Sequence, residues 1–269
     1  MPAARSKADI VAATHDTFDA ILALGESLGD GDWKVDSECP GWTVQDCFAH
    51  MLGTEQMLMG RQPPEGDIGE PAYVRNDIGK FNEAWVVAYR DRPGAELLAD
   101  LRAVVDERYA ALDELTDEAF DEVGFTPAGQ DTHGRFLQIR IFDCWIHEQD
   151  CRGPLGRPGH GTGGAVESAL DELTNSMGFV FGKKAGATDG QSLELVLTGD
   201  TARTIRVKVD GRAGVVESLD GEPTVRVELP TLDWFRIAAG RRPGSAADAS
   251  ITGDVDLGTR LLTNAAYTI

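Results

Sequence analysis

The segment GPLGRPGHGTGG, residues 153–164, separates two parts of the chain that differ in hydrophobic periodicity. Its glycines and prolines interrupt regular structure, which predicts a linker. Before it, apolar residues recur at helical spacing in five segments: 6–29, 43–60, 77–90, 93–115 and 135–151. After it, a helical segment at 165–181 leads into three strand-like alternations and two further helical segments: SLELVLTG (192–199), TIRVKVDG (204–211), PTVRVELP (223–230), TLDWFRIAAGR (231–241) and LGTRLLTNAA (257–266).

This order of elements predicts a two-domain α+β chain. Residues 1–152 are expected to form an all-α four-helix bundle, without strands before residue 150, and residues 165–269 a small α+β domain. One helix should begin after Thr43, because Thr-Val-Gln-Asp resembles a capping box. Trp42 and Trp145 adjoin helical segments, and their large apolar rings are expected to be largely buried.

The composition narrows the possible partners. A formal charge of −20 on 269 residues would repel nucleic-acid phosphates, so no nucleic-acid partner is expected. No apolar run approaches the roughly 18 residues of a membrane-spanning helix, and the N-terminus lacks a signal-peptide core. We therefore expect a cytoplasmic protein with no membrane partner. Residues 1–152 carry 13 basic and 30 acidic side chains, whereas residues 153–269 carry 12 and 15, which supports two domains.

The four cysteines all lie in the predicted bundle: Cys39, Cys47, Cys144 and Cys151. None belongs to a CxxC pair, so zinc-finger and thioredoxin-like sites are not supported. In a cytosolic chain these thiols are expected to be reduced. Cys47 and Cys144 have apolar neighbours and are predicted to be small core residues.

The sequence GRFLQIRIFDCWIHEQDCRG, residues 134–153, contains a candidate metal-binding pair. Asp143 and His147 are four residues apart, so they project from one helical face one turn apart. His50, on an apolar helix, is the natural third ligand. Two imidazoles and one carboxylate suit Zn²⁺ and accept Ni²⁺, Fe²⁺ or Mn²⁺, and three protein ligands leave a position open for water or substrate.

Other interpretations compete with this site. Asp143 and His147 could form only a hydrogen-bonded pair, and a histidine on an apolar helix is more often a satisfied core residue. His147 and Asp150, three residues apart, are a competing pair of similar stereochemical merit. The remaining histidines have polar or glycine-rich neighbours and are predicted to lie at the surface: His15, His133 and His160. No glycine-rich phosphate loop follows a strand and no GxSxG motif occurs, so nucleotide-binding and serine-hydrolase functions lack support.

Two motifs resemble those of the mycothiol-dependent maleylpyruvate isomerase family. WKVDSECPGWTVQDCFAHMLGTE (33–55) is similar to the family's Cys-Pro-Gly-Trp-Thr signature, and RIFDCWIHEQDCRGPLG (140–156) is similar to its second signature. The resemblance covers nearly the whole chain. It implies a DinB-like four-helix bundle followed by a sterol-carrier-like domain, to which TIRVKVDG, LDWFRIAAGRRP and ITGDVDLGTRLL are similar.

The resemblance places the family's metal triad on His50, Asp143 and His147. The family's acidic ligand is commonly Glu, so Asp143 is one methylene shorter than expected. An arginine of the C-terminal domain contributes to the family's active site, and Arg241 is the match, with Arg242 and Arg236 as rivals. Asp150 is expected to orient a ligand without binding the ion directly.

These residues predict a mycothiol-dependent metalloenzyme. Zn²⁺ would lower the pKa of a coordinated thiol and hold it as thiolate. The thiolate would transfer to a small electrophile, or add reversibly to a cis double bond and so isomerise it. The second hypothesis is a non-enzymatic module, in which the bundle keeps its metal and the C-terminal domain binds an apolar ligand.

Overall fold

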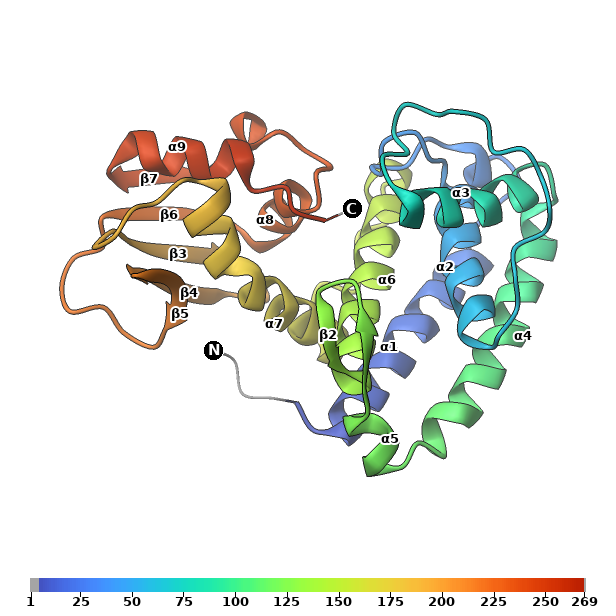
Figure 1. Ribbon diagram of the computed structural model, residues 1–269. Coiled ribbons are helices and arrows are strands. Elements are labelled where there is room, and N and C mark those ends of the chain that lie inside the picture. Colours follow the sequence, from blue (N-terminus) through green and yellow to red (C-terminus); the bar gives the residue numbers. More distant parts are fainter. Residues whose placement is uncertain (1–4, 269) are drawn as a thin grey trace. The chain divides into compact units, whose positions relative to one another are not determined.

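The computed structural model describes residues 5–268, except for the side chain of Ala246. The chain divides into two compact units, Ser6–His160 and Gly161–Thr268, and Arg5 belongs to the second (Figure 1). The division lies within the segment that the sequence predicts as a linker. The first three residues of that segment are helical, however, because the last helix of the first unit continues to Leu155.

The first unit is a four-helix bundle, which confirms the predicted architecture. Its principal helices are α1 (Lys7–Glu26), α2 (Val44–Leu58), α4 (Gly94–Asp113) and α6 (His133–Leu155). Contacts run from α1 to α4, from α4 to α2, from α2 to α6 and from α6 back to α1, which closes the bundle. Two shorter helices, α3 (Asp77–Arg90) and α5 (Asp117–Asp121), accompany it.

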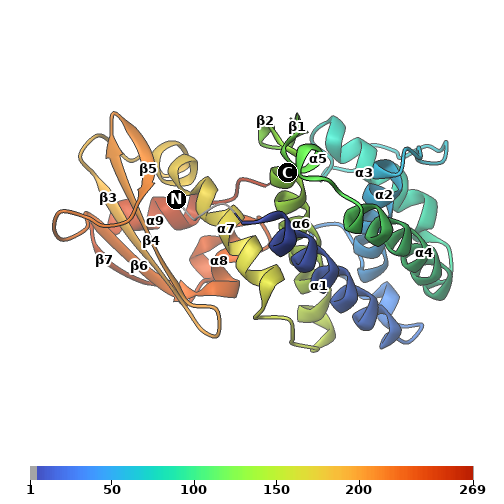
Figure 2. The same cartoon turned by 90° about the horizontal axis from the view of Figure 1, so that it is seen from below.

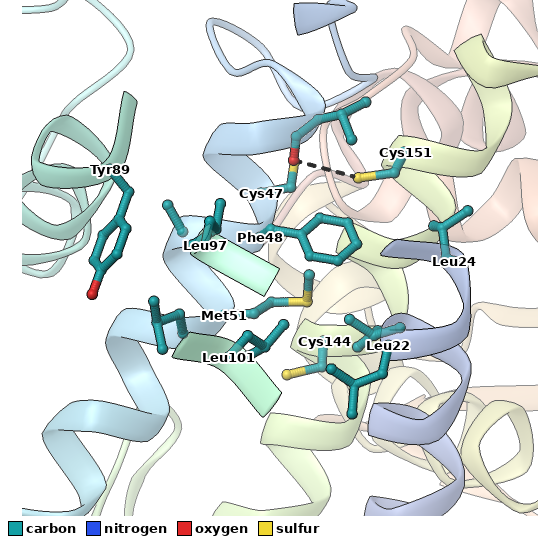
Figure 3. Close-up of a cluster of buried hydrophobic side chains, with 14 of the residues drawn as sticks. Leu22, Leu24, Cys47, Phe48, Met51, Tyr89, Leu97, Leu101, Cys144 and Cys151 are labelled. Atoms are coloured by element: carbon teal, nitrogen blue, oxygen red, sulfur yellow. Dashed lines mark hydrogen bonds between the residues drawn. The ribbon is translucent and has the colours of Figure 1, made fainter. Parts of the chain in front are cut away.

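The bundle core is built from residues on α1, α2, α4 and α6, together with residues of α3 such as Tyr89 (Figure 3). Phe48 and Met51 of α2 are fully buried within it, as is Leu97 of α4. Cys47 and Cys144 are also buried, as predicted, and their thiols are free. The helical periodicity read from the sequence therefore corresponds to the apolar faces that meet here.

Local signals set the ends of the two helices that carry the candidate site. Thr43 and Asp46 form the predicted capping box at the start of α2. Near the C-terminal end of α6, Pro154 has no N–H to donate to the carbonyl of Asp150, four residues earlier. The Asp150 carbonyl accepts instead from the backbone N–H of Glu38 at 2.9 Å. A proline inside the helix thus anchors the loop before α2 to α6.

The prediction of no strand before residue 150 is wrong. β1 (Val123–Thr126) and β2 (Gly129–Thr132) form an antiparallel hairpin directly before α6. Residues 123–132 contain Pro127 and Gly129 and lie next to polar residues, so they looked like a loop. Gly129 adopts a φ of 112°, which a glycine tolerates at the turn, and Thr126 donates its hydroxyl to the Gly129 carbonyl.

The second unit is a five-stranded sheet with helices on one face (Figure 2). The strand order is β5-β4-β3-β6-β7, with β3 parallel to β6 and the other pairs antiparallel. The strands are β3 (Ser192–Thr198), β4 (Arg203–Asp210), β5 (Arg212–Val216), β6 (Val225–Pro230) and β7 (Ser250–Gly253). The helices are α7 (Gly164–Phe179), α8 (Thr231–Ala238) and α9 (Val255–Asn264).

Alternate residues of β3, β4 and β6 are buried, which confirms the strand periodicity predicted for these segments. The edge strands β5 and β7 are not among the predicted elements. They are only five and four residues long, and each contains a glycine, Gly214 within β5 and Gly253 at the end of β7. Within residues 5–268, no helix has the length and apolar character to cross a membrane.

Candidate metal centre

The structure brings His50, Asp143 and His147 together. His50 Nε2 lies 3.2 Å from Asp143 Oδ2, and His147 Nε2 lies 3.5 Å from Asp143 Oδ1. One ligand atom from each residue lies within 4.8 Å of the other two. Ligands about 2.0–2.2 Å from a tetrahedral ion are separated by about 3.3–3.6 Å, so the nitrogen–oxygen spacings fit a zinc-class ion.

Two packed helices supply these ligands. His50 projects from α2, while Asp143 and His147 project from successive turns of α6, and α2 contacts α6 directly. The histidine side chains are only 5% and 6% exposed, whereas that of Asp143 is 32% exposed. The group therefore opens to solvent on the carboxylate side, where a further ligand could enter.

The surroundings prepare two of the three side chains for cation binding. Burial lowers the pKa of His50, although the Asp143 charge opposes this shift, so the imidazole is held neutral. Burial raises the pKa of Asp143, but the charges of His50 and Arg140 outweigh it and hold that pKa well below its ordinary value. A neutral imidazole and an ionised carboxylate are the forms that bind metal ions. In the third side chain, burial lowers the pKa of His147, but the contacts with Asp143 and Asp150 outweigh this and raise it well above its ordinary value, so an ion must displace a proton there.

Trp42 forms an aromatic wall beside the two histidines. Its ring centroid lies 5.2 Å from that of His50 and 5.5 Å from that of His147. The indole Nε1 donates to Glu83 at 3.1 Å, and Glu83 is itself buried on α3. Trp145 is fully buried, which confirms its predicted burial, and Trp42 is partly buried and packs against the bundle core.

Gly41 shapes the loop that carries Trp42. It adopts a φ of 84°, and a Cβ atom there would lie 2.3 Å from the Tyr73 ring. A side chain at this position would therefore meet both backbone strain and a steric clash.

Asp143 also belongs to a network of buried charges that was not predicted from the sequence. Arg140 donates to the Asp143 carboxylate and, through Nη2, to Glu55 Oε1 at 2.9 Å. Arg108 Nε donates to the other Glu55 oxygen at 2.9 Å. Arg108, Glu55 and Arg140 are all buried. The network holds the Asp143 carboxylate in place through Arg140 and supplies positive charge beside it.

The sequence spacing of Arg140 and Asp143 could have predicted part of this network. Arg140 precedes Asp143 by three residues, so the two side chains can meet on one helical face. Glu55 and Arg108 lie on α2 and α4, and their approach to Arg140 depends on helix packing.

Two family models match the chain. The model described as the mycothiol maleylpyruvate isomerase N-terminal domain matches residues 14–152. The chain belongs to the mycothiol maleylpyruvate isomerase family. The model described as the MDMPI C-terminal domain matches residues 167–260, so the family assignment extends across both units. This confirms the resemblance read from the two N-terminal motifs.

Solved structures share the fold. The crystal structure of the mycothiol-dependent maleylpyruvate isomerase is 17% identical, with a TM-score of 0.58 over 91% of this chain and 93% of that one. A histidine-to-alanine mutant of that isomerase gives a TM-score of 0.57 at the same identity and coverage. No curated protein sequence matches. At this identity the likeness establishes the fold, a helical domain followed by a sheet-containing domain.

The arginines considered for this family's active site belong to the second unit. Arg241 follows α8 and donates its Nη1 to the Ala239 carbonyl at 2.8 Å. Its rivals both face Asp233: Arg242 at 2.5 Å and Arg236 at 3.9 Å. The assignment of Arg241 rests on the family resemblance.

The prediction that His160 is a surface residue is wrong. Its side chain is only 8% exposed, and Nδ1 lies 2.5 Å from Oε2 of the fully buried Glu148. Its carbonyl accepts from Trp145 Nε1 at 2.9 Å. The glycine-rich neighbours suggested an exposed loop, but this loop packs against α6.

Replacing His160 with alanine should destabilise the first unit in a pH-dependent manner. Burial lowers the pKa of His160, but the contact with Glu148 outweighs this and raises it. The stabilisation is therefore full below the ordinary histidine pKa and is lost as pH rises through the folded-state pKa. We expect the free energy of unfolding to fall by about 1–3 kcal/mol at pH 6 and by less at pH 9.

Urea denaturation at the two pH values measures this difference. His133→Ala is the matched control, because burial lowers the pKa of His133 and its contribution changes with pH in the opposite direction. An equal loss for His160→Ala at both pH values would contradict the prediction.

Proposed function

We propose that this chain is a mycothiol-dependent metalloenzyme that activates the thiol for reaction with a small electrophile. The reaction is transfer of the thiol to the electrophile, or cis–trans isomerisation as in maleylpyruvate isomerase. The observation that carries the proposal is the convergence of His50, Asp143 and His147 in a member of this family. These three residues would hold the ion, and Zn²⁺ is the ion that their donor set suits.

When bound, the ion would supply Lewis acidity that stabilises a thiolate at neutral pH. The residues of the chain prepare this chemistry. His50 presents a neutral imidazole, and Arg140 keeps Asp143 ionised and oriented. Trp42 packs beside both imidazoles and limits the access of water from that side. The side chain of Asp143 is partly exposed, so a thiol would approach the ion from that side.

Substrate binding forms a further part of the proposal. Arg241 would bind a carboxylate of the electrophile, as the family resemblance implies, and a guanidinium can do so through two hydrogen bonds. In the isomerisation, the thiolate adds to the conjugated cis double bond, the resulting single bond rotates, and the thiolate leaves to give the trans acid. The thiol is regenerated, so the reaction needs no oxidant or reductant.

Turnover with different thiols tests the proposal. Zinc-loaded protein should consume mycothiol with a small electrophile, or isomerise maleylpyruvate, and should use glutathione poorly. The panel should contain maleylpyruvate and a neutral alkylating electrophile, because only the first needs a carboxylate-binding arginine. If the protein bound mycothiol and glutathione equally well and turned over neither, the enzyme proposal would be wrong, and the metal-containing binding module would take its place.

A further inference from the structure

The imidazole of His147 faces a separate group of potential ligands on each of its two ring nitrogens. Nε2 faces Asp143 and the proposed metal position. Nδ1 lies 3.1 Å from Asp150 Oδ2, on the opposite side of the ring. Cys39 completes this second group, since one ligand atom from each of Cys39, His147 and Asp150 lies within 4.8 Å of the others.

The contact at Nδ1 has the separation of a hydrogen bond but not its direction. The nitrogen is buried and makes no hydrogen bond of acceptable geometry. In contrast, 3.1 Å is close to the separation of about 3.3 Å expected between two ligands of one tetrahedral zinc-class ion. The Asp150 side chain is fully buried. The separations among the donor atoms of Cys39, His147 and Asp150 therefore fit three ligands around one ion.

The loop that carries Cys39 is fixed in place. The carbonyl of Cys39 accepts a hydrogen bond from the backbone N–H of Trp42 at 3.1 Å. The backbone N–H of Cys39 donates to Ser37 Oγ at 3.1 Å. The adjacent Glu38 N–H donates to the Asp150 carbonyl that Pro154 leaves without a helical partner. Cys39 is thus tied to the same turn of α6 that carries Asp150. It is only half-buried, which gives an ion a route of entry.

We propose that Cys39, His147 and Asp150 form a second binding site, for a thiophilic divalent cation such as Zn²⁺ or Cd²⁺. One thiolate, one imidazole nitrogen and one carboxylate oxygen are donors that zinc-class ions accept, and the sulfur selects against Mg²⁺ and Ca²⁺. Binding releases the Cys39 thiol proton to solvent. When both nitrogens of His147 carry an ion, the ring proton is also released, and the imidazole bridges the two sites.

The shared ring sets the relation between the sites. An ion at Nδ1 withdraws electron density from Nε2, so the second equivalent should bind more weakly than the first. The site is measured by metal content and spectroscopy without any thiol substrate, so it does not depend on the proposed function. Failure of the second site would leave the His50 group and its chemistry untouched.

Titration of the reduced, metal-free protein with Co²⁺ and Cd²⁺ tests the proposal. Wild-type protein should bind two equivalents and develop a near-ultraviolet thiolate-to-metal charge-transfer band. Cys39→Ser should lose the band and one equivalent, and should keep the other. His50→Ala should show the reverse pattern, keeping the band with one equivalent. These two single changes separate the sites without removing the shared histidine.

Control variants identify the sulfur. Cys144→Ala should keep the band, because Cys144 contacts Arg140 and lies outside the group. Alkylation mapped by mass spectrometry should show that Cd²⁺ protects Cys39. One equivalent without a thiolate band in wild-type protein would overturn the proposal. So would a band that survives Cys39→Ser, or one that disappears in His50→Ala.

Discussion

His50→Ala, introduced into Cys39→Ser protein, should abolish stoichiometric binding of divalent metal. The Cys39→Ser background leaves only the group of His50, Asp143 and His147, so any bound ion reports on that group. Removing one of three protein ligands opens the coordination shell, and we expect affinity for Zn²⁺ to fall by more than about 100-fold, beyond the effect of losing an outer-shell contact. Thiol turnover should fall by at least the same factor.

Equilibrium dialysis followed by metal analysis measures the effect. His147→Ala should behave in the same way, because its Nε2 belongs to the same group. His133→Ala and His160→Ala should retain one equivalent, since neither side chain is a member of that group. Retention of a full equivalent by the His50 variant would assign the ion to other ligands. If the single ion bound in the Cys39→Ser background were coordinated by Asp150, with Asp143 turned away, Asp150 would replace Asp143 as the carboxylate ligand of this group.

Glu55→Ala should cause the largest loss of stability among single changes near the site. Glu55 accepts from both Arg108 and Arg140, and all three side chains are buried. Removing the carboxylate leaves two buried guanidinium groups with one negative partner fewer, a change that costs about 3–5 kcal/mol. The midpoint of urea denaturation should fall accordingly, while the slope of the transition stays unchanged.

Glu107→Ala is the matched control on the surface. Glu107 pairs with Arg61 at 2.8 Å, and both side chains are exposed. Solvent screens such a pair, so its loss should cost no more than about 1 kcal/mol. Glu55→Gln should fall between the two variants, because the amide keeps one acceptor but loses the charge. A cost below about 1 kcal/mol for Glu55→Ala would show that solvent reaches the two arginines.

The sequence by itself determined the features that depend on neighbours a few residues apart. Helical and strand periodicity located the principal helices and the three central strands, since those spacings follow from backbone geometry. The Thr43 capping box is likewise local. The four-residue spacing of Asp143 and His147 placed both on one face of α6, and the apolar helix around His50 pointed to its burial. Family membership followed from the same two segments.

Tertiary structure alone decided which distant side chains share a buried environment. Glu55 reaches Arg140 because α2 packs against α6, and His160 is buried because its loop folds back on Glu148. No local periodicity encodes these approaches. The hairpin at 123–132 was hidden for a related reason. Each strand has only four residues, and the pairing of the two strands, which neither sequence encodes alone, defines the hairpin. Asp150 and Cys39 are brought to one imidazole in the same way, by a loop that binds the carbonyl that Pro154 leaves unpaired.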